Sequence, residues 1–175
     1  MKYQLAYHSL AGGRATNQDR VVCAERDNAV LMVLADGLGG HEGGALAAEI
    51  LTQTALRAFE AVRQPVITKP SAFLALTIMQ AHKAIFARGQ AQVPPISPRT
   101  TCVLCLVQNG YAYWAHVGDS RLYHFHNGQV LSRTLDHTVT EQMRLDGLLT
   151  RARIAGLRHV GELDRVVRVR PDRVG

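Results

Sequence analysis

The feature that most constrains this chain is an unbroken apolar run that ends abruptly in a carboxylate and glycines. Residues 29–35 read AVLMVLA, and Asp36-Gly37-Leu38-Gly39-Gly40 follows directly. A short continuous apolar run of this kind is typical of a strand buried in the middle of a sheet. The glycines after it permit backbone conformations that other residues resist. We therefore expect a central strand whose end places Asp36 at the edge of the sheet, where a cleft can open.

The remaining patterns predict strands, then two helices, then more strands and a last short helix. Apolar side chains at helical spacing predict helices over residues 43–63 and 71–88. Asn109-Gly110 and Asn127-Gly128 lie between strand patterns and predict hairpins. A short helix capped by Asp136 is expected over residues 137–145. The other expected strands are residues 3–8, 20–25, 100–107, 111–117, 121–125 and 129–132. Because hairpins imply antiparallel pairing, the sequence predicts an α+β fold with helices packed on antiparallel sheets.

The net charge of +6 is concentrated near the C-terminal end of the sequence. Residues 151–175 contain seven arginines and three acidic residues (+4), whereas residues 1–150 contain 13 Lys/Arg and 11 Asp/Glu (+2). A basic tail can bind nucleic acid, but this one lacks interleaved aromatic residues, so we expect no nucleic-acid binding. No apolar run is long enough to span a bilayer, and the N-terminus lacks a secretory pattern. We therefore expect a cytoplasmic protein that makes no membrane contact.

The three cysteines predict neither a disulfide framework nor a metal site. Cys102 and Cys105 form a C-x-x-C inside an apolar strand pattern, and Cys23 lies elsewhere. Residues three apart on a strand point to opposite faces, so these two thiols diverge. A zinc site would need further ligands, and the chain has no second C-x-x-C. We expect buried free thiols.

Three polar clusters carry the chemistry. They are Arg14 with Asn17-Gln18-Asp19, Asp36-Gly37 with its glycines and His41, and Gly118-Asp119-Ser120-Arg121. Hard divalent cations prefer carboxylate, carbonyl and water oxygens, and the planar guanidinium of Arg14 suits a phosphate. Each cluster alone also fits an ordinary turn, and it is their combination and order that indicate a site.

The motifs RATNQD, LADGLGGHEGG, RTTCVLCLVQNGYAYWAHVGDSRLYHF and TLDHTVTEQM resemble the successive motifs of bacterial PPM-type (type 2C) metal-dependent serine/threonine protein phosphatases. They occur in the family's order, and the resemblance covers about residues 1–150. It implies the family fold, an antiparallel β-sandwich flanked by helices. It also implies two, and in some members three, Mn²⁺ or Mg²⁺ ions and hydrolysis of phosphoserine and phosphothreonine in proteins.

The resemblance also implies roles for individual residues. Asp36 would bridge two metals, and Gly37 would add its carbonyl oxygen. Asp19, and less directly Gln18, would support the metal-bound water network. Arg14 would hold the substrate phosphate, and Asp119 would help to bind a third metal. Leu38 stands where many eukaryotic members carry a histidine, which fits the bacterial branch.

Two aspartates that the family places late in its sequence, in an Asp-Gly and an Asp-Asn, have no clear counterpart here. Asp146-Gly147 is a candidate for the first, but it follows a helix pattern rather than an apolar strand, and no Asp-Asn occurs after Asp119. From about Arg151 the resemblance fades. We therefore divide the chain into residues 1–150, the N-terminal portion of a phosphatase domain, and a basic divergent tail, residues 151–175.

Two functional hypotheses follow. The first is a monomeric phosphatase acting on phosphorylated proteins, the substrates of a serine/threonine kinase. The second is a truncated or non-catalytic phosphatase-like protein that binds phosphoproteins or other partners without turnover. A third hypothesis is a small basic protein that binds nucleic acid.

Overall fold

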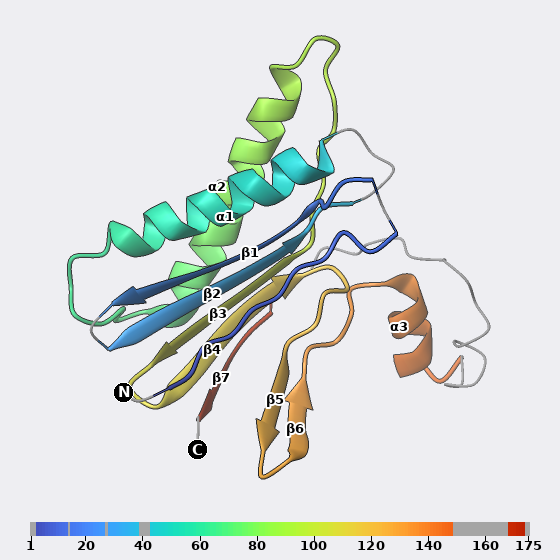
Figure 1. Cartoon of the computed structure of the whole chain (residues 1–175). Coiled ribbons are helices and arrows are strands. Elements are labelled where there is room, and N and C mark those ends of the chain that lie inside the picture. The colour runs from blue at the N-terminus through green and yellow to red at the C-terminus, as the bar shows by residue number, and fades with distance from the viewer. Residues whose placement is uncertain (1–2, 14, 27, 39–42, 149–167, 174–175) are drawn as a thin grey trace.

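The chain folds around one antiparallel sheet with two helices packed on one of its faces (Figure 1). The computed structural model describes residues 3–13, 15–26, 28–38, 43–148 and 168–173. The sheet has five strands in the order β1-β2-β3-β4-β7, and β5 and β6 form a separate two-stranded sheet. The strands are β1 Asp19–Arg26, β2 Ala29–Asp36, β3 Cys102–Gln108, β4 Tyr111–Val117, β5 Tyr123–His126, β6 Gln129–Arg133 and β7 Arg168–Arg173. The helices are α1 Gly44–Glu60, α2 Pro70–Gln90 and α3 Val139–Leu145.

The apolar run Ala29–Ala35 forms most of β2, a strand paired on both sides, as its composition predicted. It pairs antiparallel with β1 along its whole length and with β3 on its other edge. The helix layer over one face accounts for the apolar residues at alternate positions, Ala29 to Ala35, and on the other face Val30 is buried while Leu34 is 37% exposed. Both helices lie between β2 and β3 in the sequence, so neighbouring strands of the sheet are joined by a long helical connection.

The core lies between the sheet and the helix pair. Alternate residues of β2 and β3 point into it, because successive side chains of a strand face opposite ways. The fully buried side chains of this layer include Leu31, Val33, Leu104, Leu106, Phe59 and Leu74. The side-chain amide of Gln108 also fixes the loop between the helices, since it accepts a hydrogen bond from Ile67 N (3.0 Å) and donates one to Ile67 O (2.8 Å).

Both Asn-Gly pairs form the predicted hairpins. Asn109 and Gly110 have φ values of 52° and 75°, and Asn127 and Gly128 have 48° and 75°. Two successive positive φ angles are what a two-residue hairpin turn needs to match the twist of its strands. The first turn joins β3 to β4 and the second joins β5 to β6.

The predicted strand over residues 3–8 is wrong. This segment has no regular secondary structure, and Tyr7 is 71% exposed. Alternating apolar residues suggested a strand, but a strand forms only where a neighbouring strand offers its backbone groups, and no described strand pairs here. The first helix is also shorter than predicted and ends at Glu60, before Pro65 is reached.

The predicted cap of the last helix is also wrong. The N-cap of α3 is Thr138, whose hydroxyl accepts a hydrogen bond from Glu141 N (3.2 Å). Asp136 instead receives two hydrogen bonds from the guanidinium of Arg121. A bidentate pair of opposite charges is stronger than a single cap bond, so it determines where the Asp136 carboxylate points.

The expected α+β fold with antiparallel sheets and helices is confirmed. Part of the basic tail, β7, pairs with β4, so the edge of that strand is covered. None of the helices in the described part of the chain is long and apolar enough to cross a membrane. The division at residue 150 stays a prediction.

Two phenylalanines allow a matched test of the core. Phe59 is fully buried, whereas Phe86 is 62% exposed on α2. Phe59→Ala should lower the free energy of unfolding by about 3–5 kcal/mol, because it leaves a cavity between α1 and the sheet. Phe86→Ala should change it by less than about 0.5 kcal/mol. Urea denaturation followed by circular dichroism measures both, and equal losses would contradict this assignment of the core.

Candidate functional site

The start of β1 and the end of β2 bring two aspartates together. In the antiparallel register Asp19 lies directly opposite Asp36. Residues opposite each other in such a pair have Cβ atoms about 4.5–5.5 Å apart on the same face of the sheet. Ala35 points into the core beneath the helices, so Asp36 and Asp19 point to the other face. Both are partly buried. Two strand ends therefore present two carboxylates side by side.

The backbone of Asp36 is held by two threonines that directly precede β3. Thr101 N and Thr100 Oγ1 both donate to Asp36 O, at 2.9 and 3.0 Å. Asp36 N donates to Thr101 Oγ1 at 3.1 Å. The pairing continues past the strand, because Gly37 and Thr100 form a bridge and Leu38 N donates to Arg99 O at 3.1 Å. The peptide groups that carry the Asp36 side chain are thus fixed on both sides.

Gly37 lies where a side chain would not fit. A Cβ there would lie 2.5 Å from Gly44 O and 2.7 Å from Gln18 O. A Cβ on Gly44, in turn, would lie 2.6 Å from Gln18 Oε1. The first turn of α1 therefore packs directly on the loop after β2. We expected glycine here so that its carbonyl could approach a metal, and the structure adds a packing requirement that the sequence did not reveal.

Gln18 carries a buried oxygen without a hydrogen-bond donor in the described part of the chain. Its Oε1 atom is inaccessible and contacts the backbone near Gly44. An acceptor buried in this way carries a desolvation cost unless a water, cation or other donor reaches it. This orphan oxygen therefore lies against the first turn of α1.

The loop that carries Asp119 follows β4 at the same end of the sheet. Gly118 has a φ of 104°, and a Cβ there would lie 2.8 Å from Thr101 Cγ2. Ser120 Oγ hydrogen-bonds to Thr101 Oγ1 at 2.7 Å. One buried hydroxyl, that of Thr101, therefore contacts both the backbone of Asp36 and the loop of Asp119. The Asp119 side chain itself is exposed.

A pair of histidines fixes the other side of this loop. His137 N donates to Gly118 O at 3.0 Å, and the rings of His116 and His137 stack with centroids 4.3 Å apart. His116 Nε2 hydrogen-bonds to Leu135 O at 2.8 Å. Both residues are buried, so the segment before α3 and the end of β4 hold each other in place.

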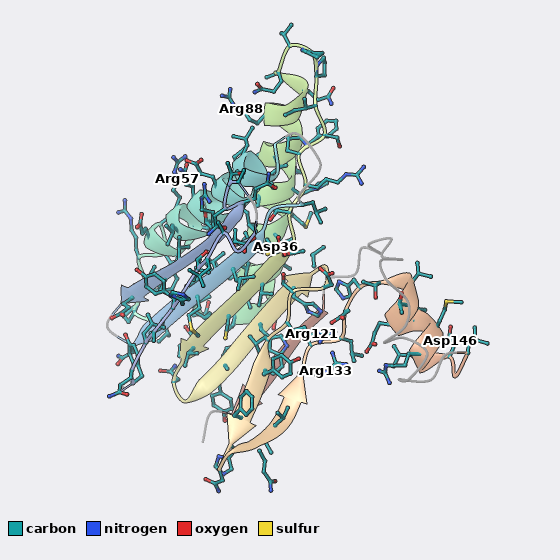
Figure 2. The ribbon with its side chains drawn as sticks, turned by 45° about the vertical axis from the view of Figure 1, so that its right-hand side comes forward. Asp36, Arg57, Arg88, Arg121, Arg133 and Asp146 are labelled. Carbon is teal, nitrogen blue, oxygen red and sulfur yellow. The ribbon has the colours of Figure 1, made fainter. Side chains whose placement is uncertain are left out.

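An ion network joins this segment to the β5–β6 hairpin. Arg121 contacts both oxygens of Asp136, at 2.6 and 2.5 Å, and Arg144 contacts both oxygens of Glu141, each at 2.8 Å. Arg133 lies between the two pairs, 3.7 Å from Asp136 Oδ1 and 3.3 Å from Glu141 Oε1. Figure 2 shows Arg121 and Arg133 close together. Hydrogen bonds from Arg144 lower the pKa of Glu141, and those to Asp136 raise the pKa of Arg121. Arg121, the last residue of the third polar cluster, is therefore bound to a carboxylate.

Asp146 does not join the other carboxylates. It ends α3, where Gln142 Nε2 donates to its Oδ1 at 2.8 Å, and Gly147 follows with a φ of 74°. This is the usual role of a glycine just after a helix. Figure 2 shows Asp146 well away from Asp36. The Asp146-Gly147 pair is therefore a helix end.

Cys102 and Cys105 are buried free thiols, as expected, whereas Cys23 is free and half-buried. Cys102 belongs to the core beneath the helices, and Cys105, three residues on, is buried without belonging to it. Both are free, and burial raises the pKa of each thiol to about 12. Such thiols stay protonated at neutral pH.

Arg14, a predicted site residue, and His41, a member of the second polar cluster, lie outside the residues that the structure describes. Among residues that are described, no three His, Cys, Asp or Glu side chains are close enough to hold a metal ion together. Asp19 and Asp36 are adjacent, and Asp119 is at the same end of the sheet but exposed. The roles given to these residues stay predictions.

Three comparisons describe what the chain resembles. The family model for protein phosphatase 2C matches residues 9–144. Protein phosphatase PhpP of Streptococcus pneumoniae is 28% identical over 138 residues, which are 78% of this chain and 56% of that protein. The chain spans about half the length of the first curated relatives it matches, 52–56%.

The solved structures extend this similarity to the fold. The crystal structure of the serine/threonine phosphatase Stp1 from Staphylococcus aureus superposes with a TM-score of 0.81 at 25% identity, covering 93% of this chain and 67% of that one. The catalytic domain of the phosphatase PstP, crystallised with two manganese ions, gives a TM-score of 0.76 at 23% identity and covers 93% and 68%.

Gly37→Ala tests the packing of α1 on the strand end. The added methyl would meet backbone atoms of Gly44 and Gln18, which cannot rotate away, so we expect a loss of about 1–3 kcal/mol in unfolding free energy. Gly13→Ala is the matched control, because no atom lies within 4 Å of a Cβ at that position. Thermal denaturation compares the two, and a Gly37→Ala protein as stable as the control would contradict the close approach.

Thr101→Val tests the shared hydroxyl. It keeps the shape of the side chain but leaves the Asp36 N–H buried without its acceptor, which should cost about 1–3 kcal/mol. Ser120→Ala removes only the second of the two bonds and should cost less. Urea denaturation of both single variants and the double variant gives the coupling energy. Additive effects would show that the two hydroxyls do not act through one another.

Proposed function

Since this chain belongs to the protein phosphatase 2C family, we propose that it carries the first part of a metal-dependent site for hydrolysing phosphoserine and phosphothreonine in proteins. The observation that carries the proposal is the pairing of Asp19 with Asp36 at one end of the sheet. Like charges directly opposite on neighbouring strands repel each other, and a divalent cation shared between them would remove that repulsion.

The residues around this pair fit a hard cation in part. Carboxylate oxygens are the ligands that Mg²⁺ and Mn²⁺ prefer, and Gln18 would support the metal-bound water network less directly, as the family resemblance implies. Asp36, Asp19 and the carbonyl of Gly37 would hold the ions, with Asp119 contributing to a third. Bound ions of this kind supply an activated water and neutralise charge that develops on the phosphate.

Other residues of the chain would position the metal-binding carboxylate and bind the substrate. The hydrogen bonds from Thr100 and Thr101 fix the backbone of Asp36, so its carboxylate needs little reorganisation to hold a charge. Arg14 would bind the substrate phosphate through its planar guanidinium. The phosphoprotein substrate, the monomeric state and the cytoplasmic location expected from the sequence belong to this proposal.

A non-catalytic phosphatase-like protein is the second candidate, and one observation favours it. In the part of the chain that the structure describes, no three potential metal-binding side chains meet. The Asp146-Gly147 pair ends a helix instead of adding a carboxylate. In that case the chain would bind phosphoproteins or other partners without turnover.

Manganese-dependent hydrolysis of a phosphothreonine peptide separates the two candidates. Activity should appear with Mn²⁺, disappear with a chelator, and fall at least about 100-fold in Asp36→Asn, which removes a metal-binding charge. Asp146→Asn is the matched control, because it changes the other Asp-Gly pair and should keep full activity. Wild-type activity equal to that of Asp36→Asn, together with no Mn²⁺ binding by calorimetry, would favour the non-catalytic candidate.

A further inference from the structure

Helix α2 exposes a row of side chains that plays no part in the site. The row consists of Ala72, Leu76, Met79, Lys83, Phe86 and Gln90, and we call it the α2 seam. All six residues are exposed. Leu76, Met79 and Phe86 are 55%, 54% and 62% exposed. Three large apolar side chains in one row on a single helix are more than the scattered exposure common on protein surfaces.

The α2 seam lies on the side of the helix that faces away from the core. The buried residues Leu74, Thr77, Ile78 and Ala81 anchor the opposite side of α2 on the sheet and α1. The C-terminal half of the helix projects beyond the end of the sheet (Figure 1). The helix therefore has two apolar faces, and only one of them is used within the described part of the chain.

The spacing of the α2 seam identifies the shape of its partner. Its six positions are separated by four, three, four, three and four residues, the alternation that forms the contact row of a coiled coil. Such a row is narrow, and its side chains insert between those of a second helix. A helix that lies on a membrane needs a wider apolar face, and here Lys83 would be in the middle of it. The row thus fits a helix better than a lipid surface.

The charges on α2 indicate the chemistry of that helix. Its sequence PSAFLALTIMQAHKAIFARGQ contains Lys83 and Arg88 but no aspartate or glutamate. Lys83 stands inside the row, and a single lysine there selects a partner with an acceptor at the facing position. A second copy of this chain would bring basic helices together without any carboxylate between them. Charge complementarity therefore favours an acidic partner.

We propose that the α2 seam is a docking surface for an amphipathic helix of another protein, with apolar residues along its contact row and a carboxylate opposite Lys83. A pair of helices about 31 Å long, the length of α2 at 1.5 Å per residue, forms a small interface of the transient kind. The contact would lie on the helix layer, on the other face of the sheet from Asp19 and Asp36, so both could be occupied at once.

Designed peptides as long as α2 test the proposal on the full chain. The first set carries leucine along its contact row except for one glutamate, at the position that faces Lys83. The second set carries a lysine at that position instead. Each set has one version for parallel and one for antiparallel pairing with α2. Fluorescence anisotropy should show salt-sensitive binding of a glutamate peptide only. Lys83→Glu should reverse the preference by about tenfold or more in each direction, as expected for one exchanged charge pair.

Matched variants and alternative occupants complete the test. Phe86→Asp should abolish binding, whereas Arg88→Glu, the same charge change off the row, should leave the glutamate peptide bound within about twofold. Equal binding of both peptides, or none, would overturn the proposal.

Sedimentation as a dimer without peptide, lost in Phe86→Asp, would assign the row to a second copy. Retention on phosphatidylserine vesicles, lost in the same variant, would assign it to a membrane, and either result overturns the acidic helix.

Discussion

The structure depends on the alignment of β2 and β3 at the point where Asp36 meets Thr101. These two residues exchange hydrogen bonds through both backbone groups of Asp36 and the buried hydroxyl of Thr101. The same hydroxyl reaches Ser120. This contact holds the end of β2 and the loop after β4 in a fixed relation, and the start of β1 is placed by its own pairing with the end of β2. A shift of one residue between β2 and β3 would turn Asp36 to the opposite face.

Much of the fold could be predicted because local signals agreed with the tertiary structure. The apolar run before Asp36 became a strand paired on both sides, and both Asn-Gly pairs became hairpin turns. The predictions failed where a local signal needed a partner that the sequence could not name. Residues 3–8 have the alternation of a strand without a described strand beside them. Asp136 has the position of a helix cap, but Arg121, fifteen residues away, binds its carboxylate instead.

The residue types of the candidate site could be predicted from the sequence, but most of the contacts that hold these residues in place could not. Order along the chain indicated that Asp19 and Asp36 belong together, and the register places them opposite each other. The sequence did not indicate that Thr101 would hold the backbone of Asp36, because threonine is common in and beside strands. The need for glycine at position 37 was visible, but its cause, the first turn of α1 lying against it, depends on a packing contact that no short motif records.

The long connection between β2 and β3 has a kinetic consequence. Asp36 and Thr101 are 65 residues apart in the sequence, with both helices between them. Contacts of such high separation form slowly, because the intervening chain must lose its freedom before they are made. Helices and Asn-Gly hairpins need only local contacts and can form earlier. A folding chain would therefore have its helices and turns in place before its two aspartates are fixed, and the site would be among the last parts of this protein to acquire its shape.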